Sequence, residues 1–397
     1  MSVYSIICEY NPFHNGHKYQ IDSLKPNTVV CLMSSNVVQR GSFAVCDKYS
    51  RARAAVECGA DLVLEIPFPY SAMSAEYYAT AGIEILTALG FAEYLSFGSE
   101  CGQTESLEHI AEYLVSQKYE EDFKSIITCK PQLSYASARE LAILQTLGEE
   151  YAQIIKQPNN ILGVEYIKAI KKKNSHIIPV TLMRHCADYH DDMPTGNFAS
   201  AGNIRKLIAS KADIKSLVPP QAYDMYTSLA EQKKMPSDMK NIENGILAFL
   251  RMTPAEKLKD YYDCAPVADI IKKAAADSVT LEELYDKCST KSYTRSRIRR
   301  CITCAYLGVE KSYAYESPAY TSVLALNSRG AELLAIARKN SGIAVITKPA
   351  HIKKYVGTEV YRQYMAGVTA DDVFALTLPE PERAGWGLRR GPVVSQL

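Results

Sequence analysis

Two histidines three positions apart are the residues best suited to chemistry in this sequence. They lie in the segment His14-Asn15-Gly16-His17, between an apolar run at residues 3–8 and a helix-like stretch. Two imidazoles over the first turn of a helix join its free N–H groups and its positive dipole end, and Gly16 lets a phosphate approach closely. Such a site stabilises charge on an α-phosphate and on departing pyrophosphate. The alternative is that both histidines only cap the helix.

The elements that must position these histidines alternate between strand-like and helix-like stretches. This alternation is typical of βαβ units and a parallel sheet. We therefore predict an α/β domain with a Rossmann-like parallel sheet over residues 1–215. The expected strands are residues 3–8, 28–33, 61–66, 94–97 and 176–182, and the expected helices are residues 16–24, 48–58, 107–116, 135–147 and 165–173.

Beyond about residue 210 the pattern becomes mainly helical. Pro219 and Pro220 mark a break, and the final segment, residues 385–391, is expected to be mobile. We predict a second, mainly α-helical region over residues 216–397. Its expected helices are residues 222–231, 242–251, 267–276, 281–287, 292–307 and 331–339, and its short strands are residues 323–326 and 344–346.

The composition limits the class of protein. A chain of 397 residues suits two or three domains. Its net charge of +1 argues against nucleic-acid binding over the whole surface, but not against a local basic patch. Neither a signal peptide nor a membrane span is expected. The eleven cysteines are interpreted as reduced thiols of a cytoplasmic protein, and Cys301 and Cys304 as helix residues and not zinc ligands.

Several segments resemble one family. The His-x-Gly-His segment resembles the ATP-binding signature of the nucleotidyltransferase superfamily, which is related to class I aminoacyl-tRNA synthetases. From residue 1 to about 375, and less closely in the second half, the chain resembles the bacterial tRNA(Met) cytidine acetate ligases. The segments that carry this resemblance are Glu9-Tyr10-Asn11-Pro12-Phe13-His14-Asn15-Gly16-His17, Gln39-Arg40-Gly41, Ala60-Asp61-Leu62-Val63, Phe97-Gly98-Ser99-Glu100 and Gln157-Pro158-Asn159-Asn160-Ile161-Leu162-Gly163.

The resemblance implies a reaction in two steps. Acetate attacks the α-phosphate of ATP, which is expected to bind with Mg²⁺, and gives acetyl-adenylate and pyrophosphate. The acetyl group then passes to N4 of the wobble cytidine, C34, of elongator tRNA(Met). No protein nucleophile is needed, because the adenylate is the activated carrier. No dedicated metal site and no protein partner are expected.

The resemblance also implies the site residues. His14 and His17 would be catalytic, and Gly98, Asn159 and Arg184 would complete the ATP site. Taken alone, these three could be a turn glycine, a helix cap and a surface residue. The segment that would bind ATP is Ile7, Cys8, Glu9, Tyr10, Asn11, Pro12, Phe13, His14, Asn15, Gly16, His17, Lys18, Tyr19 and Gln20.

Residues 200–205 resemble the second signature of the nucleotidyltransferase superfamily. Ser200 and Arg205 would place a hydroxyl and a guanidinium near the β- and γ-phosphates. This chain departs from the family at two positions, since Thr is usual where Gly202 stands and Gly is commoner at Ser35.

A basic stretch in the second half is the candidate tRNA contact. It would attract backbone phosphates, and the alternative is a solvated helix face. Two other functions stay open: transfer of a nucleotide to a small phosphate-bearing metabolite, or RNA binding without catalysis. The candidate tRNA-binding residues are Lys291, Arg295, Arg297, Arg299 and Arg300.

Overall fold

A mixed sheet forms the centre of the computed structural model, which describes residues 2–184 and 196–395. Its strands are β1 (Val3–Cys8), β2 (Thr28–Ser34), β5 (Leu62–Ile66), β6 (Tyr94–Ser99), β7 (Ile178–Met183), β8 (Tyr320–Leu326), β9 (Ala344–Ile346) and β10 (Val393–Val394). They lie in the order β10-β8-β5-β2-β1-β6-β7, with β9 beside β8. The first five strands are parallel to their neighbours, whereas β8 is antiparallel to β5. A separate hairpin consists of β3 (Val37–Val38) and β4 (Ser42–Phe43).

The middle strands are apolar along their length because both faces of the sheet are covered. In β2, Val30 and Leu32 pack into one core cluster, whereas Val29, Cys31 and Met33 pack into another. Successive side chains of a strand point to opposite faces. A doubly covered parallel sheet therefore requires a continuous apolar run instead of an alternating one. The predicted α/β fold is confirmed.

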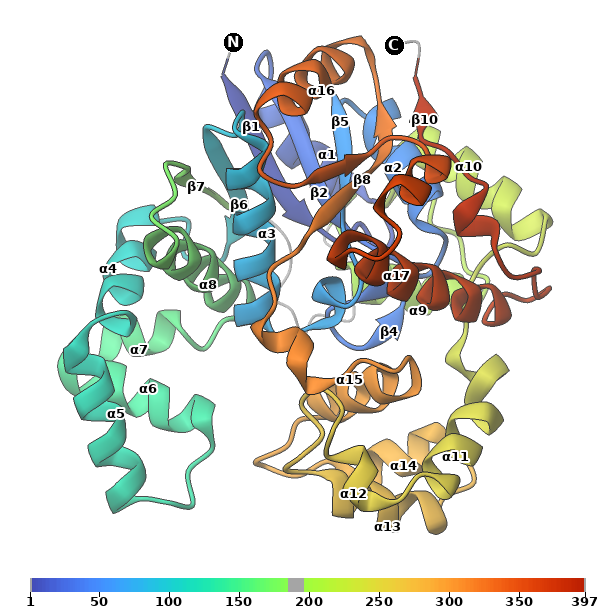
Figure 1. Ribbon diagram of the computed structural model, residues 1–397. Coiled ribbons are helices and arrows are strands. Elements are labelled where there is room, and N and C mark those ends of the chain that lie inside the picture. The colour runs from blue at the N-terminus through green and yellow to red at the C-terminus, as the bar shows by residue number, and fades with distance from the viewer. Residues whose placement is uncertain (1, 185–195, 396–397) are drawn as a thin grey trace.

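Helices surround the sheet in groups (Figure 1). A group of five, α11 to α15, lies below the carboxyl ends of the parallel strands, and α4 to α7 form a second group to one side. The helices within residues 2–184 are α1 (Asn15–Ser23), α2 (Lys48–Glu57), α3 (Ala75–Leu89), α4 (Thr104–Leu114), α5 (Gln117–Cys129), α6 (Tyr135–Thr146), α7 (Glu149–Ile154) and α8 (Pro158–Lys172). Those within residues 196–395 are α9 (Ala201–Ala209), α10 (Pro220–Glu231), α11 (Glu243–Met252), α12 (Ala255–Leu258), α13 (Ala268–Ala276), α14 (Leu281–Cys288), α15 (Arg295–Tyr306), α16 (Ser328–Asn340) and α17 (Glu359–Leu376).

The end of the chain returns to the first half. Val63 of β5 pairs with Ala325 of β8, and β10 pairs in parallel with β8. The sheet thus crosses the boundary predicted between residues 215 and 216, which stays a prediction. The expectation of a mobile final segment is wrong around Trp386, because this ring packs 5.9 Å from Tyr49 and 6.4 Å from Phe374.

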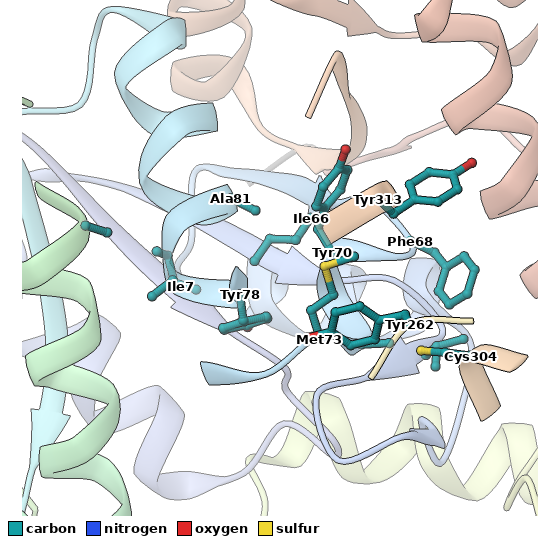
Figure 2. Close-up of a cluster of buried hydrophobic side chains, with 14 of the residues drawn as sticks. Ile7, Ile66, Phe68, Tyr70, Met73, Tyr78, Ala81, Tyr262, Cys304 and Tyr313 are labelled. Carbon is teal, nitrogen blue, oxygen red and sulfur yellow. The ribbon is translucent and has the colours of Figure 1, made fainter. Parts of the chain in front are cut away.

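A buried aromatic cluster joins the five-helix group to the sheet (Figure 2). Tyr262, which precedes α13, lies in one buried cluster with Tyr78 and other residues that follow β5, and its ring lies 6.0 Å from that of Tyr77. Its hydroxyl oxygen accepts the Ser74 N–H at 3.1 Å, and the Tyr70 hydroxyl donates to the Ser317 carbonyl at 3.1 Å. The five-helix group is therefore held by packing and by the Ser74–Tyr262 hydrogen bond, whereas the Tyr70 bond fixes the segment that leads into β8.

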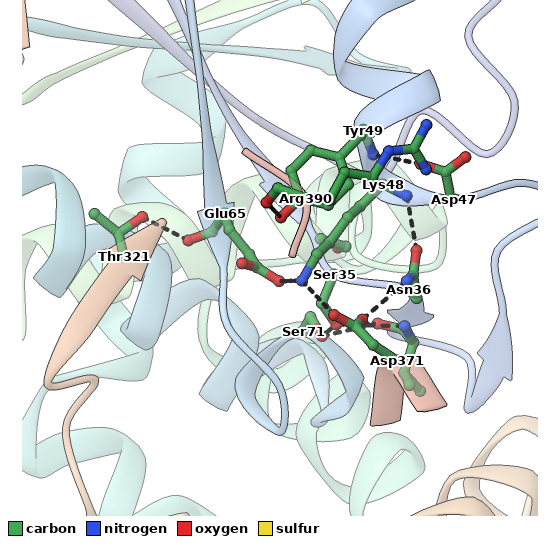
Figure 3. A network of polar contacts seen from close by, with 12 residues as sticks. Ser35, Asn36, Asp47, Lys48, Tyr49, Glu65, Ser71, Thr321, Asp371 and Arg390 are labelled. Carbon is green, nitrogen blue, oxygen red and sulfur yellow. Dashed lines mark hydrogen bonds and ion pairs between the residues drawn. The ribbon is translucent and has the colours of Figure 1, made fainter. Parts of the chain in front are cut away.

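A buried polar network attaches α17 to α2 and β5 (Figure 3). Lys48 Nζ lies 2.7 Å from Glu65 Oε1 and 3.0 Å from Asp371 Oδ2. Asn36 donates from Nδ2 to Asp371 at 2.9 Å and accepts the Lys48 N–H at 2.7 Å. Burial disfavours the charged ammonium, but Asp371 and Glu65 outweigh it and raise the pKa of Lys48. Burial raises the pKa of Asp371 to about 6.

Candidate active site

The order of the strands creates a crevice at one edge of the sheet. The chain passes from β1 outward to β2 and β5, and then returns to β6 on the other side of β1. Ligands of open α/β sheets bind outside the carboxyl ends of the strands at such a reversal. The His14–His17 segment follows β1, and Gly98 lies near the end of β6.

His14 and His17 stack over the first turn of α1. Their ring centroids lie 3.7 Å apart, with 27° between the ring planes. His14 Nδ1 accepts the Gly16 N–H at 3.1 Å, and His17 Nδ1 accepts the His14 N–H at 3.3 Å. The histidines therefore do cap the helix. Because Nδ1 is the acceptor in each neutral ring, Nε2 carries the proton, which leaves two N–H donors for a ligand.

Both histidines are held neutral. Burial lowers the pKa of His14 to about 3, and the positive charges of Arg184 and Arg205 contribute to the shift. Burial also lowers the pKa of His17, with further contributions from His14 and Arg184. At neutral pH the stacked rings can therefore donate hydrogen bonds without repelling each other or the two guanidinium groups.

Contacts from beyond residue 196 fix the backbone of this segment. Tyr226 of α10 accepts the Phe13 N–H at 2.9 Å and donates to the Phe13 carbonyl at 3.2 Å. Asn15 Nδ2 donates to the carbonyls of Asn197 and Ser216 at 2.8 and 2.9 Å. Sequence reasoning missed Tyr226, since a tyrosine on an apolar helix face gives no sign of a backbone contact 213 residues away.

A cleft of about 820 Å³ opens beside the histidines. Most of the predicted ATP-site residues line this cleft. The predicted residues that line it are Ile7, Cys8, Glu9, Tyr10, Asn11, His14, His17, Gln20, Gly98, Asn159, Arg184, Ser200 and Arg205. The predicted residues that do not line it are Pro12, Phe13, Asn15, Gly16, Lys18 and Tyr19.

Gly98 and Asn159 have local roles that their sequence contexts did not indicate. Gly98 belongs to a strand and not to a turn, and a Cβ there would lie 3.1 Å from Arg184 Cγ. The absence of a side chain lets Arg184 lie across the end of β6. Asn159 Nδ2 donates to Glu100 Oε1 at 2.6 Å, and Glu100 also accepts the N–H groups of Asn159 and Asn160. Glu100, and not Asn159, therefore caps α8.

Ser200 and Arg205 are brought to the same cleft. Ser200 is the N-cap of α9, and its hydroxyl oxygen accepts the Asn203 N–H at 3.1 Å. Arg205 Nη1 donates to the Asn11 carbonyl at 2.5 Å. Burial lowers the pKa of Arg205, and the nearby carboxylate of Glu9 opposes this shift. Arg205 thus connects the second signature to the segment that carries the histidines.

The basic stretch does not form one uniform face. Arg295 and Arg299 line the cleft, and both guanidinium groups lie over the ring of Tyr285 at 5.4 and 5.3 Å. Arg297 and Arg300 instead pair with Asp263 at 2.6 and 3.4 Å. The remaining candidate, Lys291, is exposed outside the cleft, and Arg295 also pairs with Glu282 and Asp286.

Two further features bear on cofactors and membranes. Within residues 2–184 and 196–395, no three His, Cys, Asp or Glu side chains are grouped so that they could hold a metal ion. Cys301 and Cys304 are buried free thiols on α15. No helix in the same parts of the chain is long and apolar enough to cross a membrane.

The fold, the stacked histidines and the cleft define a nucleotidyltransferase of the HIGH class. A sequence model of the HIGH nucleotidyl transferase family matches residues 1–385. Two relatives named tRNA(Met) cytidine acetate ligase, from Acetivibrio thermocellus and Halothermothrix orenii, are 33% and 34% identical, and each alignment covers 96% of both chains. The chain therefore belongs to the tRNA(Met) cytidine acetate ligase family.

Solved structures agree with this assignment. The chain is similar to Thermotoga maritima TmcAL, both bound with alpha-thio ATP and in the apo form. The TM-scores are 0.93 and 0.95 at 26% sequence identity, and all of each chain is covered. The similarity extends through the helical second half, so the cleft between the sheet and α15 belongs to a shared architecture.

Proposed function

We propose that this protein is an ATP-dependent ligase that acetylates N4 of the wobble cytidine, C34, of elongator tRNA(Met). The observation that carries this proposal is the stacked pair His14 and His17, held neutral near Arg184 and Arg205 in a cleft that residues of α15 also line. The names and nearly full coverage of the relatives support the choice of acceptor. The reaction would take place in the cytoplasm, with no protein partner.

The first step forms acetyl-adenylate. ATP would lie with its α-phosphate beside His14 and His17, and it would arrive as its Mg²⁺ complex, in which the cation would offset phosphate charge. An acetate oxygen attacks the α-phosphorus, and the bond to the bridging oxygen of pyrophosphate breaks. The two Nε2–H donors and the guanidinium groups of Arg184 and Arg205 stabilise the charge that grows on the phosphate oxygens. Gly98, Asn159 and Ser200 complete the walls of this part of the cleft.

The second step transfers the acetyl group to RNA. The cytidine N4 attacks the acetyl carbonyl carbon, the bond to AMP breaks, and N4 loses one proton. The cleft lies in the upper part of the size range of small-molecule sites, so it has room for a nucleotide and a flipped base. The RNA backbone would approach along the α15 side of the cleft.

The arginines of α15 differ in their availability for phosphate. Arg299 lines the cleft, and no ion pair is recorded for it in the described part of the chain. Arg295 also lines the cleft but is paired with two carboxylates. We assign the main phosphate contact to Arg299 and an outer contact to the exposed Lys291. Arg297 and Arg300, which share Asp263, would mainly hold α15 in place.

The test is direct acetylation of RNA. Purified protein is incubated with ATP, radiolabelled acetate and unmodified elongator tRNA(Met), and the RNA is digested to nucleosides. Label is expected in N4-acetylcytidine and should disappear in His14→Ala and His17→Ala variants. His109→Ala is the matched control, because this histidine packs on Tyr151 away from the cleft. Label elsewhere in the RNA, or no label together with no ATP cleavage, would contradict the proposal.

A further inference from the structure

The cleft carboxylate closest in sequence to the histidine segment, Glu9, is fixed through a single oxygen. Glu9 directly follows β1 and lines the cleft. Its Oε1 accepts the Gln39 N–H at 2.9 Å, and its backbone carbonyl accepts Arg51 Nη1 at 2.6 Å. Within residues 2–184 and 196–395, no hydrogen bond or ion pair is recorded for Oε2. Glu9 therefore presents a held carboxylate with one oxygen available to a ligand.

Gln39 adds a donor beside this acceptor. It lines the same cleft, and its Nε2 is shielded from solvent without a hydrogen-bond partner in the described ranges. Buried polar groups are nearly always paired, so an unpaired amide at the wall of a cleft indicates a ligand group. The hairpin that carries Gln39 is fixed on α15, because the Thr303 hydroxyl donates to the Gly41 carbonyl at 2.8 Å.

This pair complements one edge of cytosine. Cytosine presents an N4 amino donor next to the N3 acceptor, and carboxylates accept from N4 in base recognition. Flipped bases are recognised along the same edge. Uracil reverses both groups, with an O4 acceptor next to an N3–H donor. A carboxylate and an amide donor in one cleft, on two residues joined by the Gln39 N–H to Glu9 bond, therefore favour cytosine over uracil.

We propose that Glu9 accepts the proton that cytidine N4 loses during acetyl transfer, while the Gln39 amide donates to N3 and orients the base. This inference rests on the proposed function. The N4 lone pair forms the new C–N bond, and the electron pair of the acetyl C–O bond leaves with AMP. One N4 proton moves to Oε2 of Glu9 and is then released to water, so each turnover regenerates the carboxylate.

The experiment separates the two half-reactions. Acetate-dependent ATP–pyrophosphate exchange reports adenylation, and single-turnover transfer from preformed acetyl-adenylate to tRNA reports the second step. The isosteric Glu9→Gln variant should lower transfer about 100-fold more than exchange, the scale of lost general-base catalysis. The acidic limb of the transfer pH–rate profile, which wild-type protein should show, should disappear in this variant. A merely structural role would leave the shape of that profile unchanged.

Gln39 is tested in parallel. Gln39→Met keeps the length of the side chain but removes the amide, so KM for tRNA in transfer should rise at least tenfold with little change in exchange. Gln117→Met, on α5 outside the cleft, is the control.

An equal fall of both half-reactions in Glu9→Gln would overturn the inference and assign Glu9 to ATP binding. Absence of exchange, or of transfer, in wild-type protein would instead refute the proposed function itself.

Discussion

His14 and His17 each use Nδ1 to accept a backbone N–H of the same helical turn, and their rings stack 3.7 Å apart. One set of contacts thus fixes the helix start, the neutral tautomer and the direction of two donors. The structural and catalytic interpretations of these histidines are compatible, because capping through Nδ1 leaves Nε2–H available to a phosphate.

These two roles can be separated by substitution. Asparagine is a good N-cap residue but is too short to place a donor where the imidazole Nε2 lies. His14→Asn should therefore keep the melting temperature within a few degrees of wild type and lower adenylation about 100- to 1000-fold, as when an oxyanion donor is lost. Thermal unfolding and ATP–pyrophosphate exchange measure the two effects. Near-wild-type exchange would refute a role for His14 in stabilising the transition state.

The low pKa of His14 predicts a pH-dependent stability. An unfolded histidine takes up a proton near pH 6.5, whereas His14 in the folded protein does so only near pH 3. Below pH 6.5 the unfolded state thus binds more protons than the folded state, so the free energy of unfolding decreases as pH falls. His14 alone should lower this free energy by about 2 kcal/mol at pH 5. Urea unfolding of wild type and His14→Asn between pH 5 and 8 should show a smaller decrease in the variant. Parallel curves would contradict this prediction.

Gly41 is predicted to be essential for the contact between the hairpin and α15. Its φ is 69°, and a Cβ there would lie 2.4 Å from the backbone of Arg300. Gly41→Ala should lower the free energy of unfolding by more than the roughly 1–2 kcal/mol that left-handed geometry costs. Gly357→Ala is the control, since its φ is 82° and nothing lies within 4 Å of its Cβ position. Equal losses in urea unfolding would show that the close approach has no energetic effect.

The network around Lys48 should be sensitive to loss of its cation. Lys48→Met leaves Glu65 and Asp371 buried without a counter-charge, which should cost about 3–5 kcal/mol. In wild type the pKa of Asp371 is raised to about 6, so the folded protein holds this proton more tightly than the unfolded chain does. The free energy of unfolding therefore decreases as pH rises from about 4 to 6. Without Lys48 this decrease should be larger and continue to higher pH.

Urea unfolding at pH 5 and pH 8 measures this difference. Lys118→Met, which breaks the exposed pair with Asp122, should change the free energy of unfolding only slightly. An equally small change in Lys48→Met would show that the buried network adds little to stability.

The predicted strands were recovered because their signal is local. A strand buried on both faces is a short apolar run, and the runs at residues 3–8, 28–33 and 61–66 coincide with β1, β2 and β5 to within one residue at each end. Helix α3 was not predicted. It is buried between the sheet and α8, so its sequence lacks the polar face from which an amphipathic helix is recognised.

By itself, the sequence determined the class of chemistry and the α/β core, because a strand, a glycine and two histidines at fixed spacing are close in the chain and constrain one another directly. Only the tertiary structure decided which residues share the cleft. It joined β8 and β10 to the sheet formed by the first half of the chain, and it brought the Tyr226 hydroxyl into hydrogen-bond contact with the Phe13 backbone. It also divided the arginines of α15 between the cleft and Asp263. These contacts depend on packing between segments that lie far apart in sequence, for which local patterns carry no information.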